Sequence, residues 1–526
     1  MIASTIRVMV VALVVMFAGV SAAAFNLDSL LVVSVGGPAA RDSLQRLTSL
    51  YTAGTVDING LQGRFEQYFV PPDRFFVELN FTNFSLVQAY DGWTAWQQDH
   101  NGQISRLEGF EKRELLKNAY FESCSYLLPD RLPGSIKYLG QTTRDEQVYH
   151  EVAFYPLDRD TVVAYYDLDR GLRKLMFARL DNFNTVTTID DYRSVAGILI
   201  PFYSRTIAEG ADLTSELAVD SVAVNQPVDM TIFTMPSAGT VDYLFPEGIG
   251  HVRIPIQYQG GHIRLAATIN GTKKARFILD SGASANLLHQ PLTTELQLPI
   301  VGALPARGLG GISQIDLVRT DSISIGKLTL YNQVAGSIDL SLLNRPGTDR
   351  EAFGGLLGYD FLSRFPVLVS YRDSMLTVFN PQQFAAPEGG VEIGFHLTML
   401  VPTIRGELNG IPGDFLVDLG NTLGLIIHRD FAHKHQLDEK LDDVRDNPTT
   451  LSGIGGRLSG QTAYAAVFKM GDILLQSLRV ILPDSSAGLS GSNELAGNIG
   501  NMVLENFDLL LDYRQARLIL YRADKE

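Results

Sequence analysis

Cysteine is nearly absent from this 526-residue chain, which contains only Cys124. A single thiol can form no intrachain disulfide and no cysteine metal cluster, so the chain must rely on apolar cores to fold. Basic residues are also scarce: 43 Lys and Arg stand against 58 Asp and Glu, which gives a net charge of −15. No cluster of Lys and Arg offsets this balance, and we expect no nucleic-acid partner.

Several catalytic motifs are missing. The sequence has no Gly-x-Ser-x-Gly motif, no P-loop and no His-Glu-x-x-His motif. His428, His433 and His435 lie near one another, and three histidines at this spacing are one candidate metal site. Residues 429–437 have the pattern of a polar helix face, which favours a solvated surface instead. We therefore expect neither a metal nor another cofactor.

Long apolar runs are confined to the start of the chain. Arg7 precedes an apolar run from Val8 to Val20, and small residues follow up to Ala24. This order predicts a secretory signal peptide at residues 1–24. An uncleaved anchor is the alternative, but the run is shorter than the roughly 20 residues that span a bilayer. We expect an exported protein, periplasmic or secreted, with no transmembrane segment after cleavage.

The length predicts two or three domains, because a chain of this size exceeds a single core. Residues 25–236 alternate apolar and polar side chains, and helical spacing appears only at 41–50 and 111–127. This pattern predicts an antiparallel sheet with a few helices lying on it. Small, turn-forming residues at 237–250 predict a linker.

The second half of the chain contains two copies of one pattern. Residues 277–284 read Phe-Ile-Leu-Asp-Ser-Gly-Ala-Ser, and residues 414–422 read Asp-Phe-Leu-Val-Asp-Leu-Gly-Asn-Thr. Each places an aspartate and a glycine after an apolar strand, which alone is typical of an ordinary turn. Further landmarks recur in the same order: Asn-Gly at 270–271 and 409–410, Gly-rich stretches at 308–311 and 453–456, and Leu356-Leu357-Gly358 against Asn498-Ile499-Gly500. The repeat predicts two all-β lobes, lobe 1 at 251–385 and lobe 2 at 386–526.

This duplicated module resembles the aspartic peptidases, arranged as two retropepsin-like lobes in one chain. The resemblance rests on Asp280-Ser281-Gly282-Ala283, the Gly-rich hairpin and Leu356-Leu357-Gly358 before a short helix. It covers about residues 251–526 and is closer in lobe 1. It implies a bilobal all-β aspartic-peptidase fold, and an aspartyl protease that hydrolyses peptides or proteins with Asp280 and Asp418 as its catalytic dyad.

Two such acids suit peptide hydrolysis. Carboxylates about 3 Å apart share one proton, so one can activate a water while the other protonates the carbonyl. The pair titrates as a unit, and the sequence does not assign the two roles. Ser281, Gly282, Gly420 and Thr422 are expected to support the dyad. The Gly-rich hairpins are expected to close over the substrate as flaps, through Gly308, Gly310, Gly311, Gly453, Gly455 and Gly456.

Lobe 2 departs from the family pattern. Leu419 stands where a Ser or Thr is usual, Asn421 replaces a small residue, and Asn498 breaks the apolar-apolar-Gly signature. The side chain of Leu419 cannot form a hydrogen bond, and Thr422 is the nearest hydroxyl that could replace it. These changes leave the carboxylate of Asp418 in place.

Residues 40–236 resemble the LolA-like lipoprotein carriers, as shown by Tyr90-Asp91-Gly92-Trp93 and the run from Asp191 to Phe202. The resemblance implies a strongly curved half-barrel with helices in its apolar concavity. A lipid or acyl ligand in that hollow is a hypothesis motivated by the density of aromatic residues. The aromatic residues Phe75, Phe76, Phe81, Trp93 and Trp96 either line such a hollow or fill the core of the sheet, and the second interpretation is favoured.

The predicted chain is therefore mainly β, with a LolA-like domain at residues 25–236 followed by a bilobal aspartic endopeptidase. The alternatives are a non-catalytic envelope protein that binds peptide or lipid, and a chaperone or sorting factor for envelope lipoproteins. Cleavage that depends on Asp280 separates the first function from the others, and lipid co-purification separates a peptide binder from a carrier.

Overall fold

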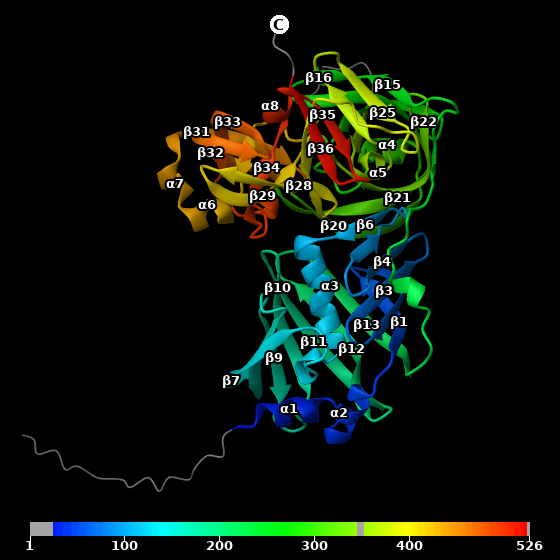
Figure 1. Ribbon diagram of the computed structural model, residues 1–526, viewed down its shortest axis with the longest axis vertical. Coiled ribbons are helices and arrows are strands. Elements are labelled where there is room, and N and C mark those ends of the chain that lie inside the picture. The colour runs from blue at the N-terminus through cyan, green and yellow to red at the C-terminus, as the bar shows by residue number, and fades with distance from the viewer. Residues whose placement is uncertain (1–24, 344–351, 523–526) are drawn as a thin grey trace, which may run out of the picture.

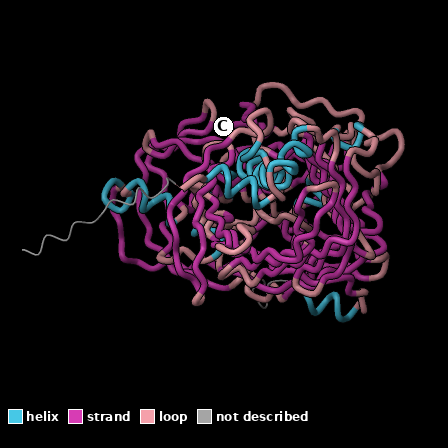
Figure 2. The backbone as a smooth tube through the Cα atoms, turned by 90° about the horizontal axis from the view of Figure 1, so that it is seen from below, coloured by secondary structure: helices cyan, strands magenta, loops and turns pink. Residues whose placement is uncertain are grey.

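The computed structural model describes residues 25–343 and 352–522, so the predicted signal peptide lies outside the described residues. Strands make up most of the described chain (Figure 2), which confirms the mainly β prediction. The first part of the chain forms one body, and two β lobes lie side by side at its upper end in Figure 1. Within the described ranges, the helices are all too short or too polar to cross a membrane.

The first body is a single antiparallel sheet of 13 strands with helices packed against it. Helix α3 contacts β4 and β5 near one edge and β8 near the other, so the sheet curves around this helix. The apolar residues of α1, α2 and α3 form one core with that face of the sheet. The strands run in the order β6-β5-β4-β3-β2-β1-β13-β12-β11-β10-β9-β8-β7. Their bounds are β1 (Leu50–Ile58), β2 (Leu61–Val70), β3 (Arg74–Phe81), β4 (Ser85–Tyr90), β5 (Ala95–Gln98), β6 (Ile104–Leu107), β7 (Gly134–Arg144), β8 (Gln147–Pro156), β9 (Val162–Asp167), β10 (Arg173–Leu180), β11 (Phe183–Val195), β12 (Ile198–Ala208) and β13 (Leu213–Val224), with α1 (Leu27–Ser34), α2 (Pro38–Gln45), α3 (Gly109–Glu122) and the 3₁₀ turns η1 (Ser125–Leu127) and η2 (Met230–Phe233).

Two predicted helices have different bounds in the structure. The helix expected at 41–50 is α2, which ends at Gln45 because the chain then joins the sheet: the N–H of Thr48 donates to the side chain of Asn225 over 2.7 Å. The helix expected at 111–127 is α3 followed by η1, and the break lies at Cys124, whose φ is 51°. Of the predicted aromatic residues, Phe75, Phe76, Phe81 and Trp96 are buried, whereas Trp93 is 88% exposed.

The two lobes repeat one topology, strand for strand. In lobe 1, β18 pairs in parallel with β23, and β19 pairs in parallel with β22. In lobe 2, β29 and β34 repeat the first pair, and β30 and β33 repeat the second. Lobe 1 contains β14 (Tyr243–Leu244), β15 (His251–Pro255), β16 (Gln257–Gln259), β17 (His262–Ile269), β18 (Lys273–Leu279), β19 (Leu287–His289), α4 (Gln290–Glu295), β20 (Ile300–Gly308), β21 (Gly311–Ile325), β22 (Leu328–Ile338), β23 (Phe353–Leu357), α5 (Tyr359–Leu362), β24 (Val367–Ser370) and β25 (Met375–Phe379). Lobe 2 contains β26 (Val391–Gly394), β27 (His396–Thr398), β28 (Val401–Leu408), β29 (Ile411–Val417), β30 (Leu425–Ile427), α6 (Arg429–His435), α7 (Leu437–Lys440), β31 (Asp442–Gly453), β32 (Gly456–Met470), β33 (Ile473–Pro483), η3 (Gly488–Gly491), β34 (Gly497–Ile499), α8 (Asn501–Leu504), β35 (Phe507–Asp512) and β36 (Arg517–Arg522).

The lobes share a six-stranded sheet, in which β24 of lobe 1 pairs with β35 of lobe 2. A single apolar core runs through both lobes beneath this sheet. Because the sheet and the core are common to both lobes, they fix the relative position of the strands that end at the two aspartates. The predicted domain boundaries stay predictions; within the predicted linker, β14 pairs with β22.

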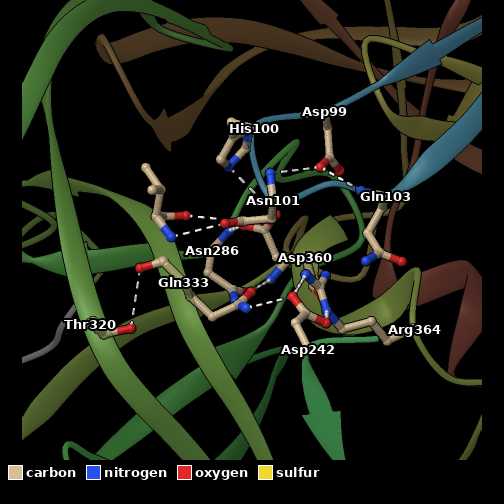
Figure 3. A network of polar contacts seen from close by, with 12 residues as sticks. Asp99, His100, Asn101, Gln103, Asp242, Asn286, Thr320, Gln333, Asp360 and Arg364 are labelled. Atoms are coloured by element: carbon tan, nitrogen blue, oxygen red, sulfur yellow. Dashed lines mark hydrogen bonds and ion pairs between the residues drawn. The ribbon is translucent and has the colours of Figure 1, made fainter. Parts of the chain in front are cut away.

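The first body contacts lobe 1 through a polar network, which Figure 3 shows in detail. Asn101, from the turn between β5 and β6, donates to a carboxylate oxygen of Asp360 over 2.9 Å. The other carboxylate oxygen of Asp360 accepts the backbone N–H of Asn286 over 2.6 Å. The side chain of Asn286 accepts in turn from Gly358, which lies beside the turn that follows Asp280. The network therefore links the first body to one of the two aspartate turns.

Candidate active site

The two aspartates occupy equivalent places at the ends of buried strands. Asp280 follows β18 and donates its backbone N–H to Leu357 over 2.9 Å. Asp418 follows β29 and donates its backbone N–H to Ile499 over 3.0 Å. Each aspartate is thus held by the parallel strand beside its own, β23 in lobe 1 and β34 in lobe 2.

The two turns face each other across the lobe boundary. The N–H of Gly282 donates to the carboxylate of Asp280 over 2.9 Å, and the N–H of Gly420 donates to that of Asp418 over 2.8 Å. A methyl group at Gly282 would collide with the carboxylate of Asp418, and one at Gly420 would collide with that of Asp280. Only glycine permits this close approach at either position. Both aspartates remain partly exposed, so a water and a substrate can reach them.

The electrostatics of the pair follow from this geometry. Burial among protein atoms is the largest cause that raises the pKa of Asp280 well above its usual value. The charge of Asp418 and a hydrogen bond with its carboxyl raise that pKa further, while the backbone N–H groups of Gly282 and Ala283 oppose the shift. Two carboxyl groups within hydrogen-bonding reach cannot both ionise, so the pair retains one proton.

Ser281 fastens the two turns together. Its hydroxyl donates to the carbonyl oxygen of Val417 over 2.7 Å and accepts the N–H of Leu419 over 3.0 Å. The side chain of Leu419 is fully buried. Asn501 provides a second connection between the lobes. Its side-chain amide donates to the carbonyl oxygen of Leu419 over 2.6 Å and to that of Gly261 of lobe 1 over 2.8 Å.

Thr422 lies next to this connection. Its side chain packs against the backbone of Gly261, at the turn between β16 and β17. Asn501 accepts the hydroxyl hydrogen of Tyr371 over 2.7 Å, so the turn after Asp418 is joined to lobe 1 through Asn501. The structure thus brings Thr422 to the lobe boundary, and the hydrogen bonds that replace the missing hydroxyl come from an asparagine instead.

A second asparagine contacts the dyad directly. The amide of Asn498 donates to the second carboxylate oxygen of Asp418 over 2.7 Å, and Asn421 donates to the side-chain oxygen of Asn498 over 3.0 Å. In the sequence, Asn421 and Asn498 stand out only as departures from the family pattern. Aligning the two repeats places them where lobe 1 has Ala283 and Leu356, and this polar-for-apolar exchange in both positions was the available signal.

The Gly-rich hairpins meet above the turns. The tip between β20 and β21 touches the tip between β31 and β32, and the N–H of Gly310 donates to the carbonyl oxygen of Ile454 over 3.0 Å. Each tip residue packs on the opposite lobe: Ile454 on an apolar cluster beside Asp280, and Leu309 on one beside residues 423–426. The six predicted glycines are thus brought together at one place: Gly308, Gly310, Gly311, Gly453, Gly455 and Gly456.

The three histidines do not converge on the dyad. His428 is buried just before α6, whereas His433 is exposed and His435 packs against Phe431 in a tilted arrangement, with 4.6 Å between ring centroids. Across residues 25–343 and 352–522, no three His, Cys, Asp or Glu side chains gather as a metal site would require.

One family model matches part of lobe 1. Residues 265–361 match the model of a family described as aspartyl protease, which confirms the predicted resemblance in lobe 1. The search of curated proteins gave no match.

Solved structures resemble the two parts of the chain separately. An aspartic proteinase from Irpex lacteus is 12% identical, with a TM-score of 0.34, over 52% of this chain and 98% of its own. A LolA superfamily protein from Nitrosomonas europaea is 10% identical, with a TM-score of 0.29, over 39% of this chain and 96% of its own. A DUF1329 family protein from Desulfovibrio piger is 12% identical, with a TM-score of 0.28, over 39% of this chain and 95% of its own.

Proposed function

We propose that the chain is an exported aspartic endopeptidase that uses Asp280 and Asp418 as its dyad. The observation that carries the proposal is the close packing of the two turns, in which the glycine of each turn lies against the carboxylate of the other lobe. Two ordinary surface turns would not be expected to bring two carboxyl groups together next to two hairpin tips. Export to the periplasm or medium rests on the apolar segment at residues 8–20 and is part of the same proposal.

The geometry suits hydrolysis by a single water. The ionised carboxylate takes a proton from the water, whose oxygen attacks the peptide carbonyl carbon, while the protonated carboxyl gives its proton to the carbonyl oxygen. In the second step the first carboxyl protonates the amide nitrogen and the second recovers a proton from the diol. The C–N bond breaks, and the dyad returns to its starting state.

The two flaps provide a means of binding an extended peptide. Backbone N–H and C=O groups near residues 308–311 and 453–456 can pair with a substrate main chain as an added strand does. Their tip residues, Leu309 and Ile454, pack on apolar clusters, and the cluster under Ile454 includes Ala283, which lies beside Asp280. The substrate class that fits is therefore an unfolded or extended segment of protein with apolar side chains near the cleaved bond.

The test replaces each acid with its neutral isostere. We expect Asp280→Asn and Asp418→Asn each to reduce cleavage of a broad peptide library by at least about 10³-fold, because neither variant has a pair of carboxyls that shares a proton. Asp414→Asn is the matched control, since Asp414 lies on the same strand but pairs with Arg405. Cleavage by both dyad variants, or none by the wild type between acidic and neutral pH, would overturn the proposal.

A second candidate is a non-catalytic envelope protein whose first body binds a lipid or acyl ligand. It is favoured by a largely apolar cavity of about 250 Å³, where Phe110, Phe183 and Leu213 meet Pro305 and Ile312 of lobe 1. Mass spectrometry of a solvent extract of the purified protein checks this candidate. An extract without an acyl species would contradict it, and peptide cleavage would show that it is not the sole function.

A further inference from the structure

The hydrogen bonds around the dyad are asymmetric. Asp418 accepts two backbone N–H groups, from Gly420 and Asn421, on one carboxylate oxygen. Its other oxygen accepts the side-chain amide of Asn498 over 2.7 Å. Asp280 accepts its two backbone N–H groups from Gly282 and Ala283. The residue of lobe 1 that corresponds to Asn498 is Leu356, which has no hydrogen to donate.

The orientation of the Asn498 amide follows from a chain of contacts that begins at the backbone. The N–H of Leu423 can only donate, and it lies 2.9 Å from one terminal atom of the Asn421 side chain, which must be the oxygen. The other terminal atom of Asn421 is then the NH₂ group, and it donates to Asn498 over 3.0 Å. The oxygen of Asn498 accepts that bond, which leaves its own NH₂ group facing Asp418. The contact with Asp418 is therefore a donor contact.

A donor N–H stabilises an ionised carboxylate more than a neutral carboxyl, because hydrogen bonds to charged groups are the stronger ones. We propose that Asn498 is a positioning residue that holds Asp418 as the ionised member of the dyad and leaves the shared proton on Asp280. The roles in catalysis, which rest on the proposed peptidase function, follow directly. Asp418 takes the proton from the attacking water, and Asp280 protonates the carbonyl oxygen of the peptide.

Apart from burial, the largest influences on the pKa of Asp280 are Asp418 and the backbone N–H groups of Gly282 and Ala283, so no third charged side chain ranks among them. Tyr513, which directly follows β35, is a buried titratable side chain whose pKa both acids influence. Burial raises the pKa of Tyr513 well above its usual value, so this phenol stays neutral wherever the dyad titrates. The difference between the two acids therefore rests on the amide of Asn498.

The protonation state of each acid can be read without turnover, by covalent labelling. A carboxylate opens an epoxide and becomes an ester, whereas a protonated carboxyl gives its proton to a diazo ester and then displaces nitrogen. We expect peptide mapping of the wild type to find the epoxide label on Asp418 over Asp280 by about tenfold or more, and the diazo label with the opposite preference. The reverse distribution in the wild type would overturn the proposal, and this arm needs no variant to fold.

The second arm removes the donor. Asn498→Leu places the lobe 1 residue in lobe 2, and we expect both labels to spread over the two acids. If the enzyme cleaves peptides, the lower apparent pKa of its pH–rate profile should rise by about one pH unit or more, since the dyad loses a charge-assisted hydrogen bond. Asn506→Leu is the matched control, because its exposed amide bonds only carbonyl oxygens of α8 among the described residues. Labels that keep the wild-type ratio in Asn498→Leu would contradict the role of Asn498.

The two arms separate this proposal from the function on which it rests. Asymmetric labelling without peptide cleavage would sustain the assignment of the proton and refute the peptidase. Cleavage that needs both acids, together with equal labelling of Asp280 and Asp418, would sustain the peptidase and refute the assignment.

Discussion

In the turn after Asp418, Leu419 stands where lobe 1 has the hydroxyl of Ser281, yet this turn is still hydrogen-bonded to lobe 1. Leu419 is fully buried in the core common to the lobes. Burying a leucine contributes about 2 kcal/mol to folding, and a neutral hydrogen bond contributes about 1 kcal/mol. The exchange is therefore compatible with stability, provided that the carbonyl oxygen of Leu419 finds a donor. Asn501 supplies it over 2.6 Å.

The residues that surround the dyad differ in how far the sequence reveals them. Asp280, Gly282, Asp418 and Gly420 follow from the repeat, because each lies a fixed step after an apolar strand. The repeat marks Asn498 as a polar exchange but not its contact with Asp418, because Asn498 lies 80 residues after Asp418 and reaches it through the pairing of β29 with β34. A contact across parallel strands depends on their register, and register is a tertiary property.

At the scale of elements, the two flaps have different neighbours. The strands β20 and β21 pack with β22 on apolar residues of the first body, among them Phe65 and Phe81. Arg307, near the end of β20, adds an ion pair of 2.5 Å with Asp181 and a hydrogen bond of 2.8 Å with Asn182, both in the turn between β10 and β11. These contacts attach the flap of lobe 1 to the first body. Both flaps belong to the sheets of their own lobes, but among the described residues β31 and β32 contribute nothing to this apolar cluster.

We predict that Arg307→Met loosens the first flap selectively. The change leaves the largely buried carboxylate of Asp181 without its cation, and breaking such a pair costs about 3–5 kcal/mol. Hydrogen–deuterium exchange measured by mass spectrometry should therefore quicken more in β20 and β21 than in β31 and β32. Arg319→Met is the control, because Arg319 lies exposed on β21. Exchange in β20 and β21 that matches the wild type would show that the apolar contacts alone hold this flap.

The elements also show where sequence patterns fail. Strands and the repeated lobes follow from alternation and from the repeated landmarks, whereas the predicted helix at 41–50 ends early at Gln45. Leu44, Leu47 and Leu50 keep helical spacing, yet Leu50 begins β1 because β1 pairs along its whole length with both β2 and β13. Two neighbouring strands supply more hydrogen bonds than one further helical turn, and tertiary pairing overrides the local pattern.

At the scale of the molecule, the first body and the two lobes meet at one aspartate. Asp181 of the first body pairs with Arg307 of lobe 1 and accepts hydrogen bonds from Ser492 and Asn493 of lobe 2, over 3.0 and 2.9 Å. These residues lie more than 120 positions from Asp181 in the sequence, and no local pattern marks them. A junction of this kind cannot be predicted from a single sequence, because it depends on how three folded parts pack.

A buried histidine makes this junction sensitive to acid. His428 of lobe 2 is fully buried, and burial lowers its pKa to about 4, while the nearby Asp181 opposes the shift and Arg307 adds to it. The unfolded chain has an ordinary histidine, with a pKa near 6.5. As the pH falls from about 6.5 to about 4, His428 binds a proton in the unfolded chain but stays neutral in the folded chain. Stability must therefore be lost over that interval, by up to about 3 kcal/mol.

We predict that His428→Leu flattens this dependence. Below pH 6.5 the free energy of unfolding of the wild type should fall more steeply than that of the variant, because the variant has no imidazole to protonate on unfolding. Urea unfolding at intervals from pH 7 to pH 4 measures the difference, which should approach one proton in slope. His433→Leu, at the exposed histidine of the same segment, should keep the wild-type slope. If the free energies of unfolding of the wild type and His428→Leu changed with pH in parallel, His428 would not be the source of the pH dependence. This conclusion holds whatever the absolute stability of the variant.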